Sequence, residues 1–196
     1  MSEHYYTSTP TSESNKRPFN ITLLGHALVF FTDAGVFSKG ELDKGTALLL
    51  NNLPPLSGHA LDLGCGWGAI GITLKKLNPD LQITMADINE RAVALTKENV
   101  KKNGITANVI QSDGFESISE AAFDSIISNP PIRAGKQVIY ALFEESHRRL
   151  KTGGCLYLVI RKQQGADSAR AFLKTFFKEV SVLKKSGGFD ILQAIK

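Results

Sequence analysis

The stretch that decides the fold is Asp62-Leu63-Gly64-Cys65-Gly66-Trp67-Gly68, which lies between a predicted strand over residues 60–63 and a predicted helix over residues 68–77. Three glycines at alternate positions let the backbone turn sharply and approach a ligand without a side-chain clash. The N–H groups at the start of a helix face the same crevice. The segment therefore predicts a ligand-binding turn of an open α/β sheet, although a tight strand-to-helix turn would by itself explain two of the glycines.

The acidic residue ahead of the glycines narrows the choice of ligand. A carboxylate at Asp62 would repel a pyrophosphate and attract the amino group of a methionine moiety. The glycine spacing also differs from the fingerprint of nicotinamide dinucleotide enzymes. We therefore expect a cationic ligand at this turn.

Strands and helices alternate on the carboxyl side of this turn. The β-prone runs are residues 81–86, 108–111, 123–128 and 155–160, and the helical runs are 90–103, 136–150 and 166–177. This alternation is typical of a parallel sheet with helices on both faces and right-handed crossovers. The last two β-prone runs, residues 179–183 and 189–195, are joined by a segment too short for a helix, which predicts an antiparallel hairpin. The sequence thus predicts a doubly wound α/β fold with a seven-stranded, mostly parallel sheet.

The N-terminal part has a different composition. Residues 1–18 are rich in Ser, Thr, Glu and Pro and predict a mobile arm, followed by a single domain over residues 19–196. Two β-prone runs, residues 19–24 and 27–31, flank Gly25-His26 and predict a short β-hairpin.

The bulk properties indicate an ordinary globular protein. The chain of 196 residues is 42% hydrophobic and 21% charged, and its net charge of +4 is compatible with a nucleic-acid partner without requiring one. No apolar run reaches the roughly 18 residues of a membrane span and no signal peptide is evident, so we expect a cytoplasmic protein. The two cysteines and four histidines lack ligand spacing, so no metal is expected.

Further polar residues follow the predicted strands. Asp87 comes about twenty residues after the glycine turn, where a carboxylate can accept hydrogen bonds from both ribose hydroxyls. Alternatively, Asp87 or Asn89 caps the next helix. Asp113, followed by Gly114, could accept from an adenine amino group, or could be an ordinary turn aspartate.

Asn129-Pro130-Pro131 follows the fourth strand of the predicted sheet. The two prolines stiffen the backbone and fix the Asn129 amide and the Pro130 carbonyl relative to the sheet. Two rigid acceptors that hold the protons of an exocyclic amine can aim its lone pair at a sulfonium methyl group. These residues therefore predict an amine-methylating site, whereas a proline-stiffened loop is the structural alternative.

Taken together, these motifs resemble those of class I, Rossmann-like S-adenosylmethionine-dependent methyltransferases, in order and in spacing, from about Gly35 to the C-terminus. Within that group, Gly35-Val36-Phe37-Ser38, Asp43-Lys44-Gly45 and residues 129–136 resemble the catalytic domain of small-subunit ribosomal RNA guanine-N2 methyltransferases, in particular the single-domain bacterial members.

The resemblance implies a role for each matching residue. The Phe37 loop would close over S-adenosylmethionine, the glycine turn would hold its methionine portion, and Asn129, Pro130 and Pro131 would form the catalytic segment. The residues expected to bind the cofactor are Phe37, Asp62, Gly64, Cys65, Gly66, Gly68, Asp87, Ile88, Asp113, Gly114 and Asn129. The residues expected to bind the substrate are Ile132, Arg133 and Lys136.

The chain departs from this family in two respects. Many relatives have an aromatic residue after the two prolines, where this chain has Ile132, so base stacking is expected from Phe37 or Phe115. Larger relatives also carry a second domain that helps to bind RNA, which this chain is too short to include. The expected phosphate contacts are Arg133, Lys136, Arg161 and Lys162.

The function expected from the sequence is methylation of an exocyclic guanine amine in 16S ribosomal RNA, as naked RNA or in the small-subunit particle. Two alternatives remain at this point. A related group of enzymes methylates a glutamine side-chain amide of a translation factor through a similar Asn-Pro-Pro segment, usually followed by tyrosine. A non-catalytic RNA-binding module of the same fold is the other alternative.

Overall fold

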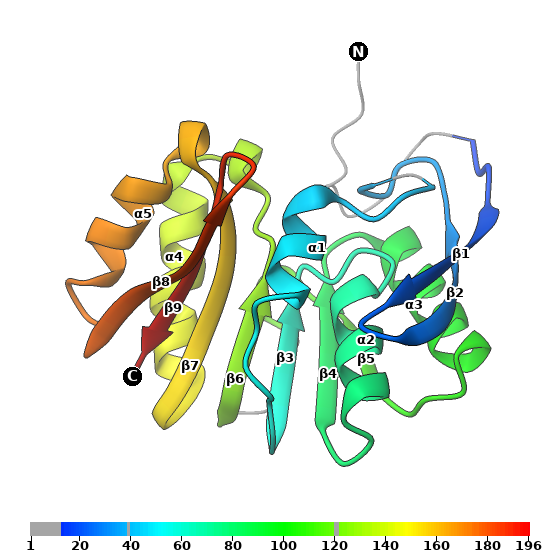
Figure 1. Ribbon diagram of the computed structural model, residues 1–196, viewed down its shortest axis with the longest axis horizontal. Coiled ribbons are helices and arrows are strands. Elements are labelled where there is room, and N and C mark those ends of the chain that lie inside the picture. Colours follow the sequence, from blue (N-terminus) through cyan, green and yellow to red (C-terminus); the bar gives the residue numbers. More distant parts are fainter. Residues whose placement is uncertain (1–12, 39, 120–121) are drawn as a thin grey trace.

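The computed structural model describes residues 13–38, 40–119 and 122–196 of the chain. A central sheet of seven strands has the order β5-β4-β3-β6-β7-β9-β8, and a separate hairpin pairs β1 with β2 (Figure 1). The strands are β1 (Arg17–Leu23), β2 (His26–Thr32), β3 (His59–Leu63), β4 (Gln82–Asp87), β5 (Asn108–Gln111), β6 (Phe123–Ser128), β7 (Leu150–Arg161), β8 (Glu179–Ser186) and β9 (Phe189–Ile195). The helices are α1 (Lys44–Leu50), α2 (Ala69–Leu77), α3 (Glu90–Lys102), α4 (Lys136–Arg149) and α5 (Ala166–Leu173), with short 3-10 turns η1 (Ile132–Ala134) and η2 (Lys162–Gln164).

The strand pairing confirms the predicted fold class. Strands β5, β4, β3, β6 and β7 are parallel neighbours, whereas β9 is antiparallel to both β7 and β8. The predicted N-terminal hairpin is also present, with β1 starting two residues earlier than expected at Arg17. Residues 1–12 of the expected mobile arm lie outside the described ranges, and Ser14 and Asn15 donate hydrogen bonds to the Asp33 carboxylate.

Two element boundaries differ from the prediction for local reasons. Strand β7 begins at Leu150 rather than residue 155, because Gly153 and Gly154 exchange backbone hydrogen bonds with Lys196. Helix α5 ends at Leu173 rather than residue 177, and the chain continues in tight turns that bury Phe177.

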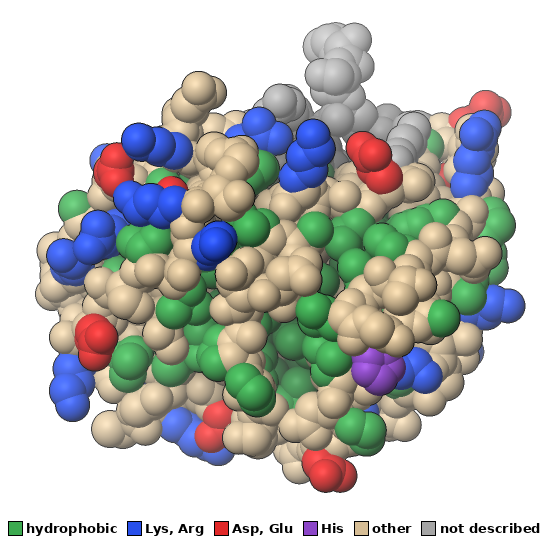
Figure 2. Space-filling view, viewed as in Figure 1, with side chains coloured by type: hydrophobic (Ala, Val, Ile, Leu, Met, Phe, Trp, Pro, Cys, Tyr) green, Lys and Arg blue, Asp and Glu red, His purple; other side chains and the backbone are tan. Residues whose placement is uncertain are grey.

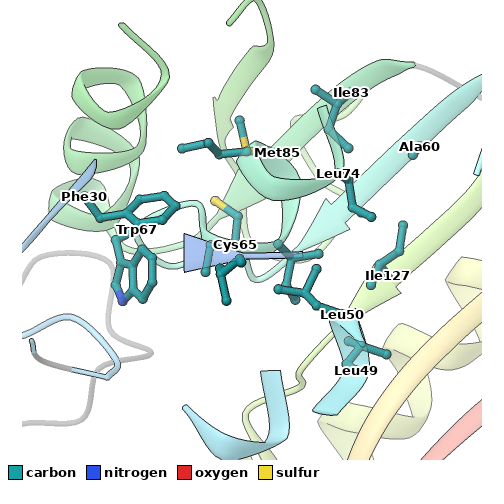
Figure 3. Close-up of a cluster of buried hydrophobic side chains, with 14 of the residues drawn as sticks. Phe30, Leu49, Leu50, Ala60, Cys65, Trp67, Leu74, Ile83, Met85 and Ile127 are labelled. Carbon is teal, nitrogen blue, oxygen red and sulfur yellow. The ribbon is translucent and has the colours of Figure 1, made fainter. Parts of the chain in front are cut away.

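Alternating side chains along the strands divide the core into two layers. Helices α1, α2 and α3 and the β1–β2 hairpin cover the face that carries Ala60, Met85 and Ile127 (Figure 3). Helices α4 and α5 cover the opposite face, which carries Leu61 and Ile126. Successive strand residues point to opposite faces, so burial of both faces is what a doubly wound sheet requires.

The outer edge of β2 pairs with side-chain amides of α3 instead of another strand. Asn99 accepts from the Phe31 N–H at 2.7 Å and donates to the Phe31 carbonyl, and Asn103 makes the same pair of contacts with Val29. Asn99 also donates to the carbonyl of Trp67 at 2.8 Å. The hairpin is thereby fixed both to α3 and to the glycine turn.

Within the described ranges, no helix combines the length and the apolar composition needed to cross a bilayer.

Candidate active site

A cavity of about 400 Å³ lies at the carboxyl ends of the parallel strands. It opens where β3 has β4 on one side and β6 on the other, which is the switch point at which open α/β sheets bind ligands. Its volume falls within the range of about 300–1,000 Å³ typical of small-molecule sites. Its walls come from the segment between β2 and α1, the glycine turn, the ends of β4, β5 and β6, and one face of α4.

The three glycines of the turn have different structural roles. Gly64 and Gly66 line the cavity at φ values of 74° and 58°, and a Cβ atom on either would meet no other atom within 4 Å. A Cβ on Gly68 would lie 2.8 Å from Cδ1 of Ile72, so Gly68 permits close packing of α2 and does not line the cavity. Cys65 also lines the cavity, and burial raises the pKa of its thiol, which stays neutral.

The backbone of the turn is largely satisfied by the protein itself. The N–H groups of Gly64 and Cys65 donate to the carbonyl of Ala86, and the N–H of Gly66 donates to Asp87. These three N–H groups precede α2, so they are distinct from the helix-start N–H groups that the sequence predicts to face the crevice. These three residues therefore leave room for a ligand, and their backbone N–H groups are not free to donate to it.

Asp62 lies beneath the turn, and it does not line the cavity. Its side chain is fully buried, Oδ2 accepts from the Gly71 N–H at 2.9 Å, and Oδ1 has no hydrogen-bond partner. Burial, together with the charge of Asp87, raises the pKa of Asp62 to about 7. Asp62 is therefore not one of the residues that line the cavity, and its expected contact with a methionine amino group stays a prediction.

Asp87 is half-buried in the cavity wall beside Ile88. Its Oδ2 accepts from the Gly66 N–H at 2.8 Å and its Oδ1 from the Asn89 N–H at 2.9 Å. Burial raises the pKa of Asp87 against the effect of these bonds. Asn89, not Asp87, is the N-cap of α3, which decides between the two residues that the sequence left open. Each Asp87 oxygen keeps a lone pair for a ligand hydroxyl.

Asp113 and Gly114 line the far end of the same cavity. Asp113 is exposed, and Val138 and Leu142 of α4 provide an apolar wall beside it. Phe115 is only 5% exposed and belongs to the core under α4, so the expectation that it could stack on a base is wrong.

Asn129 lies between this cavity and a second one. The second cavity has a volume of about 330 Å³ and shares the residues Phe37, Asp43 and Asn129 with the first. Pro131 lines the first cavity, whereas Pro130 and Ile132 line the second. The Pro130 carbonyl accepts from the Ile132 N–H at 2.9 Å and keeps its second lone pair.

Of the remaining predicted substrate residues, Lys136 does not line either cavity, and its Nζ lies 5.1 Å from the ring centroid of Tyr140. The side chain of Arg133 lies outside the described part of the chain.

The Phe37 loop covers both cavities and is held in place by several side chains. Phe37 is 37% exposed and lines both cavities. The indole Nε1 of Trp67 donates to the carbonyls of Phe37 and Ser38 at 3.0 and 3.2 Å. Asn89 donates to the carbonyl of Gly35 at 2.9 Å. The loop is therefore linked directly to the glycine turn.

Some residues at the site carry no clear signal in the sequence. Asp43 and Thr46 both contact the Asn129 amide, and the sequence offered only the resemblance of Asp43-Lys44-Gly45 to a family motif. Phe189 joins Arg161 in the second cavity through the pairing of β7 with β9, which local sequence does not reveal, and Gln164 of η2 lines the same cavity.

Comparison with known proteins shows the family of the chain. Residues 27–193 match the model of the methyltransferase small domain. The uncharacterized protein YbxB of Bacillus subtilis (strain 168) is 47% identical over the full length of both chains. The ribosomal RNA small subunit methyltransferase C of Shewanella loihica is 39% identical over 80% of this chain and 46% of its own length.

Among solved structures, T. thermophilus 16S rRNA N2 methyltransferase (RsmC), in complex with AdoMet and guanosine, superposes with a TM-score of 0.84 and 29% identity. The match covers 95% of this chain and 52% of that one. The chain thus spans about half the length of these ribosomal RNA methyltransferases. On the extent of the family match and of these identities, the chain belongs to the methyltransferase small domain family.

Proposed function

We propose that this protein is an S-adenosylmethionine-dependent methyltransferase that modifies the exocyclic N2 amine of a guanine in small-subunit ribosomal RNA. The observation that carries this proposal is the position of Asn129 in the wall between two cavities. One cavity has the residues that suit a nucleoside with a cationic tail, and the other has room for a planar base. A methyl group that passes between them does so past the three residues that both cavities share, and we assign the acceptor for the target amine to Asn129.

The first cavity suits S-adenosylmethionine in size and in chemistry. Asp87 can accept from the two ribose hydroxyls, and Asp113 can accept from the adenine amino group. The open space that faces Gly64 and Gly66 leaves room for the methionine portion. The negative charge of Asp62 and Asp87 favours a cation. When bound, the cofactor supplies an electrophilic methyl group on a sulfonium centre.

The residues of the chain then orient the target amine. An amine conjugated to a purine ring is a weak nucleophile, because its lone pair is delocalised into the ring. Asn129 Oδ1 and the Pro130 carbonyl can accept its two N–H hydrogens and so favour the tetrahedral nitrogen of the transition state. Since the two prolines fix this segment, the acceptors need little reorganisation during the reaction.

The second cavity favours a guanine over a glutamine side chain. Phe37, Phe189 and Ile132 give it apolar walls, which suit the faces of a planar ring. Arg161 lies 4.7 Å from the ring centroid of Phe189 and is a preferred partner of the O6 and N7 acceptors of guanine.

Basic residues lie at the same end of the sheet as the second cavity, which Arg161 lines. Arg161 ends β7, Lys162 begins η2, and the register of the C-terminal strands brings Lys184 and Lys185 of β8 to the same end of the sheet. Lys and Arg side chains gather at the upper left of Figure 2, where Figure 1 places the β8–β9 turn and α5. Such a group of cations suits the phosphate backbone of RNA.

A tritium-transfer assay tests the proposal. The purified protein and labelled S-adenosylmethionine are incubated with small-subunit ribosomal RNA from cells that lack the protein. A parallel reaction contains translation factors from the same cells instead of the RNA. We expect label in RNA, recovered after digestion as N2-methylguanosine, and its loss with Asn129→Ala. The matched control is Asn20→Ala on the exposed face of β1, which should keep the wild-type rate. Label in protein alone, or full activity of Asn129→Ala, would refute the proposal.

A further inference from the structure

The amide of Asn129 is held on one side by two residues of the α1 segment. Its Nδ2 donates to Oδ2 of Asp43 at 3.1 Å and to Oγ1 of Thr46 at 3.0 Å. An amide nitrogen carries two hydrogens, so both are in use. We refer to Asp43 and Thr46 together as the amide clamp.

The amide clamp decides which end of the Asn129 side chain faces a substrate. If the amide were flipped, its Oδ1 would face the Asp43 carboxylate and the Thr46 oxygen, and the two amide hydrogens would point away from them. An oxygen against a carboxylate is repulsive, so the flipped state is disfavoured. The carbonyl oxygen of Asn129 must therefore face away from the amide clamp, as an acceptor.

The local sequence builds the amide clamp into the start of α1. Asp43 is the N-cap, and its Oδ2 also accepts from the Thr46 N–H at 3.0 Å. A Cβ atom on Gly45 would lie 2.9 Å from Asp43 Oδ2 and 2.9 Å from Cε1 of Phe189. Only glycine at this position lets the carboxylate fold back over the helix while Phe189 packs against it. Thr46 is 6% exposed, so its hydroxyl is shielded from competing water.

The charge on Asp43 adds a second effect. A carboxylate that accepts from an amide N–H polarises the amide and makes its oxygen a stronger acceptor. The increase in acceptor strength matters most in the transition state, when the target amine gains positive charge and its N–H groups become better donors.

We propose that Asp43 and Thr46 are positioning residues that hold Asn129 with its acceptor oxygen toward the target amine. This inference rests on the proposed function, because it assigns the amide clamp to the same transfer step. It predicts a larger effect on the rate of transfer than on cofactor affinity, although both residues also line the first cavity.

The first test compares two changes of Thr46. Thr46→Val keeps the shape of the side chain and removes the acceptor, and we expect kcat to fall about tenfold with a much smaller change in the Kd for S-adenosylmethionine. Thr46→Ser keeps the acceptor, and its kcat should return to within about twofold of wild type. Thr22→Val on the exposed face of β1 controls for the substitution itself. Calorimetric melting shows that each variant is folded.

The second test exchanges the donor and the acceptor. Asn129→Asp alone sets two carboxylates against each other, and we expect kcat to fall about 100-fold. The double variant Asp43→Asn with Asn129→Asp restores a donor–acceptor pair, and Asn is also a good N-cap. Its kcat should therefore be at least about tenfold higher than that of Asn129→Asp alone.

The outcomes separate the two proposals. The inference would be overturned if Thr46→Val kept the wild-type kcat, or if the double variant were no faster than Asn129→Asp. In either case, an inactive Asn129→Ala variant would still support the proposed function. If Asn129→Ala itself kept the wild-type rate, the proposed function would fail, and the inference with it.

Discussion

Replacing Asp62 by Asn should remove the part of the pH dependence of folding stability that comes from the Asp62 carboxyl. Asp62 is fully buried, and its Oδ1 has no partner. Its pKa is about 7 in the folded protein, against an ordinary value of 3.8. The folded state therefore binds this proton more tightly than the unfolded state, so the contribution of Asp62 to stability is greatest below about pH 4 and is lost as the pH rises to about 7.

The size of the effect follows from these two pKa values. The interval from 3.8 to about 7, at about 1.4 kcal/mol per pH unit, corresponds to about 4 kcal/mol of unfolding free energy. In the Asp62→Asn variant, the new amide oxygen would still accept from the Gly71 N–H, and the side chain would carry no charge at any pH. Groups that titrate equally in the two proteins cancel when one stability curve is subtracted from the other.

Urea unfolding from about pH 4 to about pH 8 measures this difference, and the fluorescence of Trp67, the only tryptophan, reports on the adjacent turn. We expect the unfolding free energy of the Asp62→Asn variant, relative to that of the wild type, to increase by up to about 4 kcal/mol as the pH rises. A difference curve that is level across this range would refute the argument. The affinity for the cofactor should fall in this variant, because it lacks a negative charge behind the cavity.

Three further changes test the two cavities. Gly64→Ala puts a Cβ atom into the cofactor cavity at a positive φ and should weaken S-adenosylmethionine binding in calorimetry, whereas Gly153→Ala, with a similar φ and open surroundings, should not. Trp67→Phe removes the hydrogen bonds to the Phe37 loop and keeps an aromatic ring, so we expect the cofactor Kd to rise about five- to tenfold; an unchanged Kd would contradict the role of this link. Arg161→Ala removes the proposed partner of guanine O6 and N7, so it should weaken RNA binding in a filter assay by about 1–3 kcal/mol without changing cofactor affinity.

The order of the elements and the position of the crevice could be predicted from the sequence, because both depend on local patterns. Glycine spacing, strand-end aspartates and the two prolines each identify a turn at one edge of a parallel sheet. The same patterns could not show which groups face the ligand. Asp62 lies behind the turn and Gly68 packs against Ile72, although both belong to the motif that revealed the cavity.

The second cavity could not be predicted, because its walls come from segments far apart in the chain. Phe189 reaches Arg161 through the antiparallel pairing of β9 with β7, and Asp43 reaches Asn129 across 86 positions of sequence. Phe115 was a plausible stacking residue by its place after Asp113, and only the packing of the core excludes it. In the proposed function, stacking on the base falls to Phe37 and Phe189, the aromatic side chains that line the second cavity.

The asparagines of α3 that pair with β2 have a consequence for how the protein behaves at high concentration. An unpaired strand edge is a template to which a strand of another molecule can add, and this leads to aggregation. Asn99 and Asn103 occupy the outward N–H and C=O groups of Phe31 and Val29, so an intruding chain finds no free partner there. Because Asn99 also holds the Trp67 carbonyl, one side chain serves both colloidal stability and the shape of the glycine turn. A change that frees this edge would therefore be expected to cost solubility and ligand binding together.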